Sequence, residues 1–253
     1  IGAGIFVLTG LAAEIAGPAA ILVFAPNGVV TVLTGISYAE LASAIPKSGG
    51  GYVFVREVFS GPTSFLMGWM LSFAYMIAGA LYALGFSSNF VEFVHLYWAG
   101  LPTGPVWHIL YALTVVGLFA LLNAVSTEAS GGAETVVTII KIIILLVFAG
   151  FGAFAVEGSN FEPFFAKDDS SVAILKAMGL TFIAFEGYDL IATVTEEVEN
   201  PRENIPKAIF ISLVATVAIY LIVVWVAIGT LGAEELGRAG ETGIAEAATS
   251  FMP

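Results

Sequence analysis

Long apolar runs separated by short polar stretches make up most of this chain. A helix needs about 20 apolar residues to cross the ~30 Å hydrocarbon core of a bilayer. The pattern predicts seven membrane segments, at about residues 1–15, 19–44, 62–92, 107–125, 134–156, 171–194 and 206–231. The first segment would be only ~22 Å long, so we interpret it as the outer half of a longer helix. The expected fold class is an all-α membrane protein, with a single transmembrane domain over residues 1–253.

A charged and flexible stretch, TFIAFEGYD, interrupts the sixth segment at residues 181–189. A glycine such as Gly187 costs roughly 1 kcal/mol inside a helix, and a carboxylate such as Glu186 or Asp189 costs roughly 3 kcal/mol in mid-membrane. Membrane proteins accommodate such residues by breaking the helix at mid-depth, so that the loose main-chain groups and the charge face a polar cavity or a bound solute. The stretch therefore predicts one half of a binding site.

Glycines also interrupt the first segment, which begins IGAGIF. Gly2 and Gly4 would leave main-chain N–H groups unpaired at the start of a half-helix, where the dipole carries roughly +0.5 charge and attracts a carboxylate. Main-chain carbonyls before the break in the sixth segment, together with Glu186, would offer the opposite pole for an ammonium. The two interruptions occupy corresponding positions if the fold repeats every five helices, which is typical of inverted-repeat transporters with broken helices 1 and 6. An amino acid carries both of the charges that such a site would bind.

Simpler interpretations of these residues stay open at this point. Gly2 and Gly4 could serve close helix packing alone. Glu186 could be protonated and take no part in binding. Taken singly, Phe182 and Phe185 are typical of core or lipid-facing positions as much as of a binding site.

The composition excludes a soluble globular protein, because 58% of residues are hydrophobic and 11% are charged, with a mean hydropathy of +0.97. The absence of cysteine excludes a thiolate metal site, and the net charge of −12 argues against nucleic acid as a partner. His95 and His108 lie in or beside one loop, so we interpret them as interfacial residues and not as metal ligands. We expect no cofactor and no metal, and a multi-pass protein of the cell membrane.

Five motifs resemble the amino acid-polyamine-organocation permeases, specifically the prokaryotic relatives of cationic amino acid transporters. In chain order they are IGAGIF, SYAELASAIPKSGGGYVFVREVF, TVVTIIKIIILLVFAG, FIAFEGYD and EEVENPRENIPKAI. The resemblance implies an inverted-repeat transporter fold of which this chain contains the outer half of helix 1 up to helix 7, with the helices from the eighth onward absent. It also favours placing the glycine-rich loop and EEVENPRENIPK in the cytoplasm.

The resemblance further implies roles for individual residues. In the family, main-chain amides of a glycine motif in helix 1 hold the substrate carboxylate, and the break in helix 6 receives the ammonium and supplies an aromatic gate. A lysine in helix 5 replaces a sodium ion in proton-coupled members. Carried over, these roles assign substrate binding to Gly2, Ala3, Gly4, Ile5, Phe182, Ala184, Phe185, Glu186 and Gly187, and proton coupling to Lys141. Glu186 departs from the pattern, because many members have an uncharged residue there.

We therefore expect a secondary transporter that takes up neutral or cationic amino acids with protons, with an amino acid, the proton and the lipid bilayer as its partners. An amino acid exchanger or a polyamine transporter of the same fold is an alternative. A membrane-embedded enzyme would need clustered reactive residues, for which only Glu186 and Asp189 are candidates. A channel would need repeated polar rings or filters, which the sequence does not suggest. Lys141 has its own alternative, which is to extend its ammonium to the membrane interface.

Overall fold

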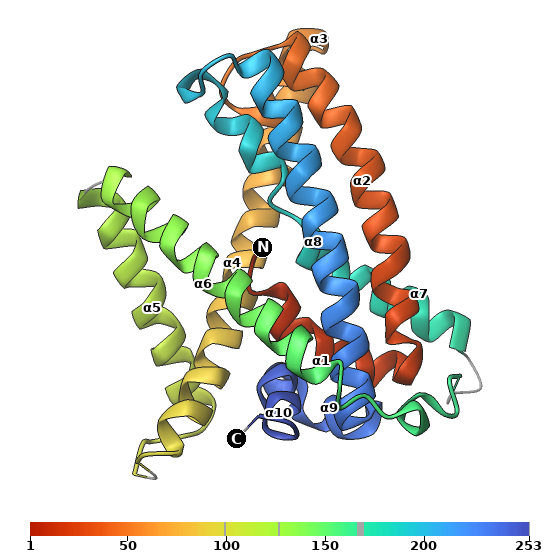
Figure 1. Cartoon of the computed structure of the whole chain (residues 1–253). Helices are drawn as coiled ribbons and strands as arrows, with labels where there is room; N and C mark the ends of the chain where they lie inside the picture. Colours follow the sequence, from red (N-terminus) through yellow and green to blue (C-terminus); the bar gives the residue numbers. More distant parts are fainter. Residues whose placement is uncertain (99, 126, 166–169, 253) are drawn as a thin grey trace.

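The computed structural model describes residues 1–98, 100–125, 127–165 and 170–252, and all regular secondary structure within them is helical. Six stretches are long and apolar enough to cross a membrane: Gly4–Ala44, Gly61–His95, Pro105–Val125, Glu134–Gly152, Ser171–Glu197 and Pro201–Leu231. This confirms the all-helical fold class. Figure 1 shows the helices as a tall bundle, with the N-terminus near its middle and the C-terminus at its lower end.

The first two predicted segments form one continuous helical stretch of 41 residues. Helix α1 (Gly4–Ala16) passes through a short 3-10 helix, η1 (Gly17–Ala20), into α2 (Ile21–Ala44). Gly17 has φ 63, a left-handed conformation that suits glycine, and Pro18 follows it in η1. The predicted boundary at these two residues is therefore a turn within helical structure. Helix α1 alone, with 13 residues, is too short to span a bilayer.

Four further helices follow the predicted segments closely. They are α4 (Gly61–His95), α5 (Pro105–Val125), α6 (Thr127–Gly152) and α8 (Pro201–Leu231). Prolines stand in the first turns of α4, α5 and α8, where the missing N–H has no helical partner to lose. Between α2 and α4 the short helix α3 (Gly50–Val58) follows the glycine-rich loop.

The sixth predicted segment is divided into shorter helices. They are α7 (Ser170–Thr181) and the 3-10 helices η3 (Phe182–Phe185) and η4 (Asp189–Glu197). Beyond α8, the region that the sequence described only as a mildly polar tail forms α9 (Ala233–Ala239), η5 (Gly240–Thr242) and α10 (Gly243–Thr249). A short 3-10 helix, η2 (Gly158–Phe161), precedes α7.

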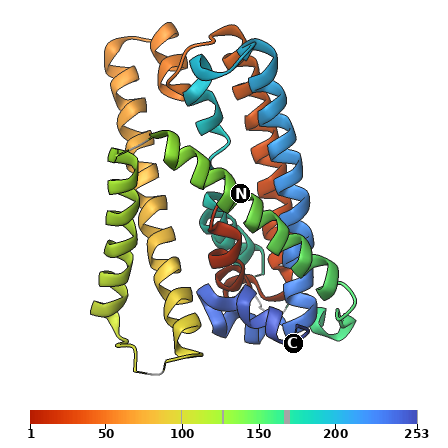
Figure 2. The same cartoon turned by 60° about the vertical axis from the view of Figure 1, so that its left-hand side comes forward.

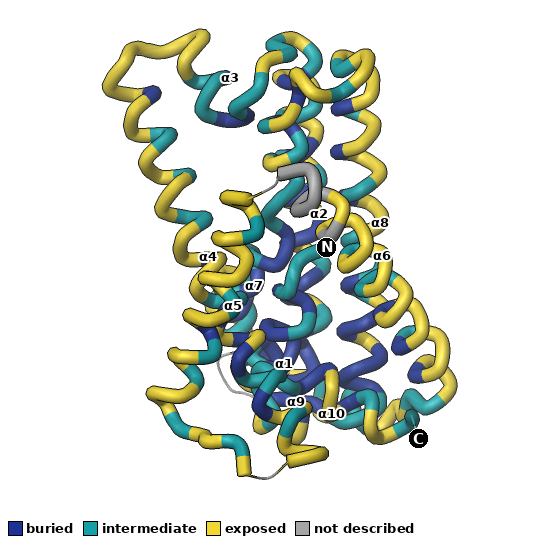
Figure 3. The backbone as a smooth tube through the Cα atoms, turned by 90° about the vertical axis from the view of Figure 1, so that its left-hand side faces the viewer, coloured by how far each residue is buried: buried dark blue, intermediate teal, exposed yellow. Residues whose placement is uncertain are grey.

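Helix α1 forms the centre of the main hydrophobic core. Ile5, Leu8 and Ala12 are fully buried, and they pack with residues of α7, η3, α8, α9 and α10. Figure 2 shows the C-terminal helices packed beneath α1, which closes this end of the bundle. Figure 3 shows that α4, α5 and α6 are largely exposed. Many of the exposed residues on these helices are large and apolar, as expected for helices in contact with lipid.

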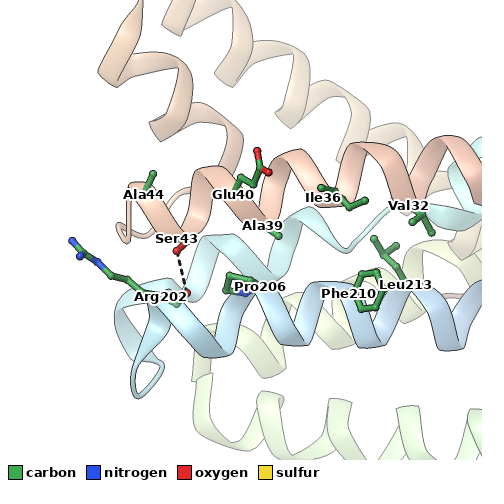
Figure 4. Close-up of a pocket in the computed structure, with 11 residues that line it drawn as sticks. Val32, Ile36, Ala39, Glu40, Ser43, Ala44, Arg202, Pro206, Phe210 and Leu213 are labelled. Atoms are coloured by element: carbon green, nitrogen blue, oxygen red, sulfur yellow. Dashed lines mark hydrogen bonds between the residues drawn. The ribbon is translucent and has the colours of Figure 1, made fainter.

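Helices α2 and α8 run side by side along the height of the molecule (Figures 1 and 2). A Cβ on Gly35 would stand 2.1 Å from Leu213 Cδ1, so this glycine permits a close approach of the two helices. A groove of about 600 Å³ lies between them toward α3 (Figure 4), and a hydrogen bond of 3.1 Å from Ser43 Oγ to the Arg202 carbonyl crosses it. This groove is separate from the predicted site residues.

Asn27 links α2 to the end of α7. Its side chain is 3% exposed, and its Nδ2 donates hydrogen bonds to the Met178 carbonyl at 2.9 Å and to Thr181 Oγ1 at 3.0 Å. Carbonyls near a helix end have no partner within the helix, and in an apolar environment they must be satisfied by a side chain. Asn27 therefore stabilises the place where α7 gives way to η3.

We expect Asn27→Ala to lower the free energy of unfolding by about 1–3 kcal/mol, because it leaves a buried carbonyl and a buried hydroxyl with fewer partners. Thermal unfolding of the purified protein in detergent measures this. Thr114→Ala is the matched control, since Thr114 is exposed and bonds only within its own helix. Equal stability of the two variants would contradict the structural role of Asn27.

Candidate binding site

The helix interruption predicted at residues 181–189 is present. The 3-10 helix η3 ends at Phe185, and Glu186 is extended with φ −68 and ψ 161. Gly187 follows with φ 107, a conformation that side-chain-bearing residues rarely adopt. Helical structure resumes at Asp189. The glycine is therefore required by the backbone at this position.

Tyrosines of α4 bind both sides of the break. Tyr82 Oη donates to the Ile183 carbonyl at 3.0 Å, and Tyr75 Oη donates to Asp189 Oδ2. The other carboxylate oxygen of Asp189 accepts the Gly187 N–H at 3.1 Å. These contacts satisfy polar groups that an unbroken helix would have paired internally, as a break at membrane depth requires.

The N-terminal segment lies directly against this break. Residues 1–3 precede α1 and are half-buried, and the Ala3 carbonyl accepts the N–H groups of Phe6 and Val7 at 3.0 and 3.1 Å. A Cβ on Gly4 would stand 2.6 Å from Ala184 Cα, closer than real Cβ contacts come. A Cβ on Gly2 would make only ordinary van der Waals contacts, with Tyr82 Oη and Cζ at 3.7 and 3.8 Å and with the Gly4 nitrogen at 3.9 Å. The two glycines therefore differ, because Gly4 permits main-chain contact with η3 whereas space remains beside Gly2.

The nine predicted binding residues fall into two groups by burial. Four of them are enclosed in the core: Gly4, Ile5, Ala184 and Phe185. The other five are half-buried: Gly2, Ala3, Phe182, Glu186 and Gly187. The Phe185 ring packs between Phe24 and Tyr220, with centroid distances of 6.0 and 5.2 Å. The structure thus brings both predicted halves together, and a ligand would reach the half-buried members first.

Glu186 is a half-buried carboxylate without an ion-pair partner among the described residues. The groups that interact with it electrostatically include Asp189 and the hydroxyls of Tyr75, Tyr82 and Tyr188. Two carboxylates and several phenols thus gather at one end of the break. This arrangement favours a cationic group arriving there.

Lys141 on α6 extends to the N-terminal segment. Its Nζ donates a hydrogen bond of 2.9 Å to the Ile1 carbonyl, and the side chain is half-buried. The ammonium therefore lies beside the main chain at the start of the chain, and its role in proton coupling stays a prediction. The contact is an alternative to extension toward the interface, and it joins α6 to the start of α1.

The structure gives no support to a metal centre within the residues it describes, since no three His, Cys, Asp or Glu side chains gather closely enough there to hold an ion. His108 Nδ1 lies 3.1 Å from Ser87 Oγ, and His95 Nε2 lies 3.3 Å from the Leu101 carbonyl.

Four polar residues around the break were not anticipated as parts of the site: Asn27, Tyr75, Tyr82 and Tyr220. Each has a side chain that can form hydrogen bonds and stands in a mainly apolar helix. Inside a membrane such a residue is expected to find a polar partner, and this was the signal in the sequence that could have identified them.

Residues 1–252 match the family model described as amino acid permease. The chain is 31% identical to the branched-chain amino acid permease BcaP of Bacillus subtilis, over 88% of this chain and 50% of that protein. It is 29% identical to the inner membrane transport protein YbaT of Escherichia coli, over 100% of this chain and 57% of that protein. It is also 29% identical to human cationic amino acid transporter 4, over 88% of this chain and 37% of that protein. The chain thus spans about half the length of the curated relatives it matches.

The difference between Gly4 and Gly2 gives a prediction. Gly4→Ala should destabilise the protein by about 1–3 kcal/mol, because its Cβ would overlap the Ala184 main chain. Gly2→Ala should leave the stability within about 0.5 kcal/mol of the parent, since its Cβ has room. Thermal unfolding of the two variants in detergent distinguishes them. If both variants, or neither, lost stability, the proposed close contact of Gly4 with η3 would be wrong.

Proposed function

This chain belongs to the amino acid permease family, and on that premise we propose that it forms part of a secondary transporter carrying an amino acid across the cell membrane. Permeases are transporters and not enzymes, so Glu186 and Asp189 need no catalytic role. The observation that carries the proposal is the contact between the glycine segment and the broken helix, where Gly4 permits close approach to Ala184. Two half-helices with loose main-chain groups then share one site, as in transporters with broken helices.

In this proposal the two ends of the amino acid bind to opposite poles. The carboxylate binds to main-chain N–H groups at the start of α1, from Gly2, Ala3, Gly4 and Ile5, where the helix dipole is positive. The ammonium binds beside the interrupted end of η3, near Glu186. The side chains of Phe182 and Phe185 form the wall of the site there, and Gly187 provides the turn that ends the helix.

The charge of the substrate follows from Glu186. Because no lysine or arginine among the described residues neutralises it, this carboxylate favours neutral or cationic substrates over acidic ones. The relatives named as a branched-chain amino acid permease and a cationic amino acid transporter are consistent with this range.

A polyamine transporter of the same fold is the second candidate, and Glu186 is the observation that favours it. A polyamine would complement Glu186 and Asp189 but would place no anion near the positive start of α1. The glycine segment therefore favours an amino acid over a polyamine.

We further propose that proton coupling depends on Lys141. A protonated Lys141 donates to the Ile1 carbonyl and so holds the N-terminal segment against α6. A deprotonated amine would hold it less strongly, which would favour movement of α1 relative to α6. Protonation would then bias the equilibrium between two conformations of the transporter, which is the requirement for coupled alternating access. The proposal also includes an inverted-repeat fold, in which further helices of the full-length transporter pack with those of this chain.

Uptake of a panel of labelled amino acids by the full-length protein in proteoliposomes, with and without a pH gradient, tests the function. We expect saturable uptake of a neutral or cationic amino acid that increases when the outside is acidic. An exchanger would need an amino acid on the opposite side for uptake. Saturable uptake of polyamines with no response to amino acids would contradict the proposal.

We expect Glu186→Gln to weaken binding of the preferred substrate by about 1–3 kcal/mol, the range for loss of a hydrogen bond to a charged group. Binding of labelled substrate to purified protein measures this. Glu92→Gln is the control, because Glu92 is exposed on α4. Unchanged affinity in Glu186→Gln would exclude a direct role of this carboxylate in binding.

We expect Lys141→Ala to abolish uptake driven by a pH gradient while substrate binding persists at least in part, because the lysine contacts the N-terminal segment from α6. Lys176→Ala, at an exposed position on α7, should behave as the parent. The measurement is uptake at several external pH values, and sodium should have no effect on the parent. A Lys141→Ala protein with the parent's pH response would remove this residue from the coupling mechanism.

A further inference from the structure

Tyr220 on α8 has a buried hydroxyl group without a hydrogen-bond partner. Its side chain is fully buried, and within the described part of the chain its Oη is the one buried side-chain nitrogen or oxygen left without a partner. Most buried polar groups in native proteins are paired, because an unpaired one costs about 1–3 kcal/mol. This hydroxyl therefore requires a physical explanation.

The hydroxyl lies beside the predicted site for the substrate carboxylate. The groups that interact with Tyr220 Oη are the main chain of Gly2, with which it completes no well-aligned hydrogen bond, and the hydroxyl of Tyr82. Tyr82 Oη itself lies 3.7 Å from the position that a Gly2 Cβ would occupy. Two hydroxyls, one from α8 and one from α4, thus lie near one glycine.

The missing partner of Tyr220 is a hydrogen-bond acceptor. Tyr82 already donates its proton to the Ile183 carbonyl, and the Gly2 N–H is itself a donor. Neither group accepts the Tyr220 proton in this arrangement. An anionic oxygen bound beside the Gly2 N–H would accept from both the amide and the phenol, and bonds of this kind are stronger than those between neutral groups.

We propose that Tyr220 donates its hydroxyl proton to the carboxylate of the bound amino acid, and so acts as a substrate-binding residue on α8. This inference rests on the proposed function, because it requires an amino acid at the glycine segment. Gly2 and Tyr82, which lie near the hydroxyl, are half-buried, whereas Tyr220 itself is enclosed. Binding therefore requires a small displacement of residues 1–3, which precede the first helix.

Pairing with the substrate carboxylate explains why an unpaired hydroxyl is present in the core. A neutral hydroxyl in the core costs less than a charged group, yet it binds an anion specifically once the anion arrives. Its ring also packs against Phe185 of η3, with a centroid distance of 5.2 Å. A displacement of Tyr220 on substrate binding would therefore be transmitted to η3 by direct contact. One residue of α8 then connects the two halves of the site.

Tyr220→Phe tests the proposal, because it removes the hydroxyl and keeps the ring. The full-length protein is used with the amino acid that the parent transports and with the carboxamide of that amino acid, which has no carboxylate. We expect the dissociation constant of the amino acid to rise about tenfold and that of the carboxamide to stay the same. The melting temperature without ligand should stay unchanged or rise, since an unpaired buried hydroxyl is lost. Tyr111→Phe on α5, whose hydroxyl bonds to the exposed Pro102 carbonyl, is the matched control.

Several results would overturn the proposal. If Tyr220→Phe binds the amino acid as the parent does, the hydroxyl is satisfied by water alone, and the proposed function stands without it. If affinity for the carboxamide falls equally, the hydroxyl does not recognise the carboxylate. If the unliganded variant melts at a markedly lower temperature, the hydroxyl has a structural partner. A folded parent that binds no amino acid would instead end both the inference and the proposed function.

Discussion

The obligation to satisfy main-chain polar groups within an apolar environment governs this structure. The backbone leaves helical geometry at Glu186 and Gly187, which interrupts the helical ladder of N–H to C=O hydrogen bonds. Asn27, Tyr82 and Asp189 supply the replacement hydrogen bonds, from three different segments of the chain. The break therefore depends on the positions of α2 and α4, because Asn27 and Tyr82 must lie within hydrogen-bond distance of it.

Close packing of small residues holds these helices at the required distance. Gly4 allows α1 to reach the main chain of η3, and Gly35 allows α2 to approach Leu213 of α8. At the lower end, Gly10 lies against the Gly240 and Leu236 carbonyls, so the C-terminal helices seal the bottom of α1. In lipid, where apolar surface has little tendency to associate, such van der Waals contact is a main source of helix association. The short helix α1 can therefore sit at the centre of the bundle without spanning it.

The polar groups that the proposals use gather around the ends of the interrupted segments. Lys141 contacts the carbonyl of Ile1, Glu186 stands at the break, and Tyr220 lies near Gly2 with its hydroxyl unpaired among the described residues. Each of these side chains is at least half-buried, so solvent and salt screen its interactions less than they would at the surface. In the proposed function, an amino acid bound between the glycine segment and η3 would link substrate binding to movement of α1.

The sequence by itself determined the helical class, the approximate membrane segments and the interruption at residues 181–189. These follow from local properties, because the length of an apolar run, a glycine and a carboxylate act where they stand in the chain. Only the tertiary structure separated Gly2 from Gly4, joined Asn27 to Thr181 across 154 residues, and placed Tyr82 and Tyr220 beside one glycine. The C-terminal helices beneath α1 were likewise visible only in the fold. Such relations depend on the depth and rotation of whole helices relative to one another, and these are set by packing between segments that no local pattern encodes.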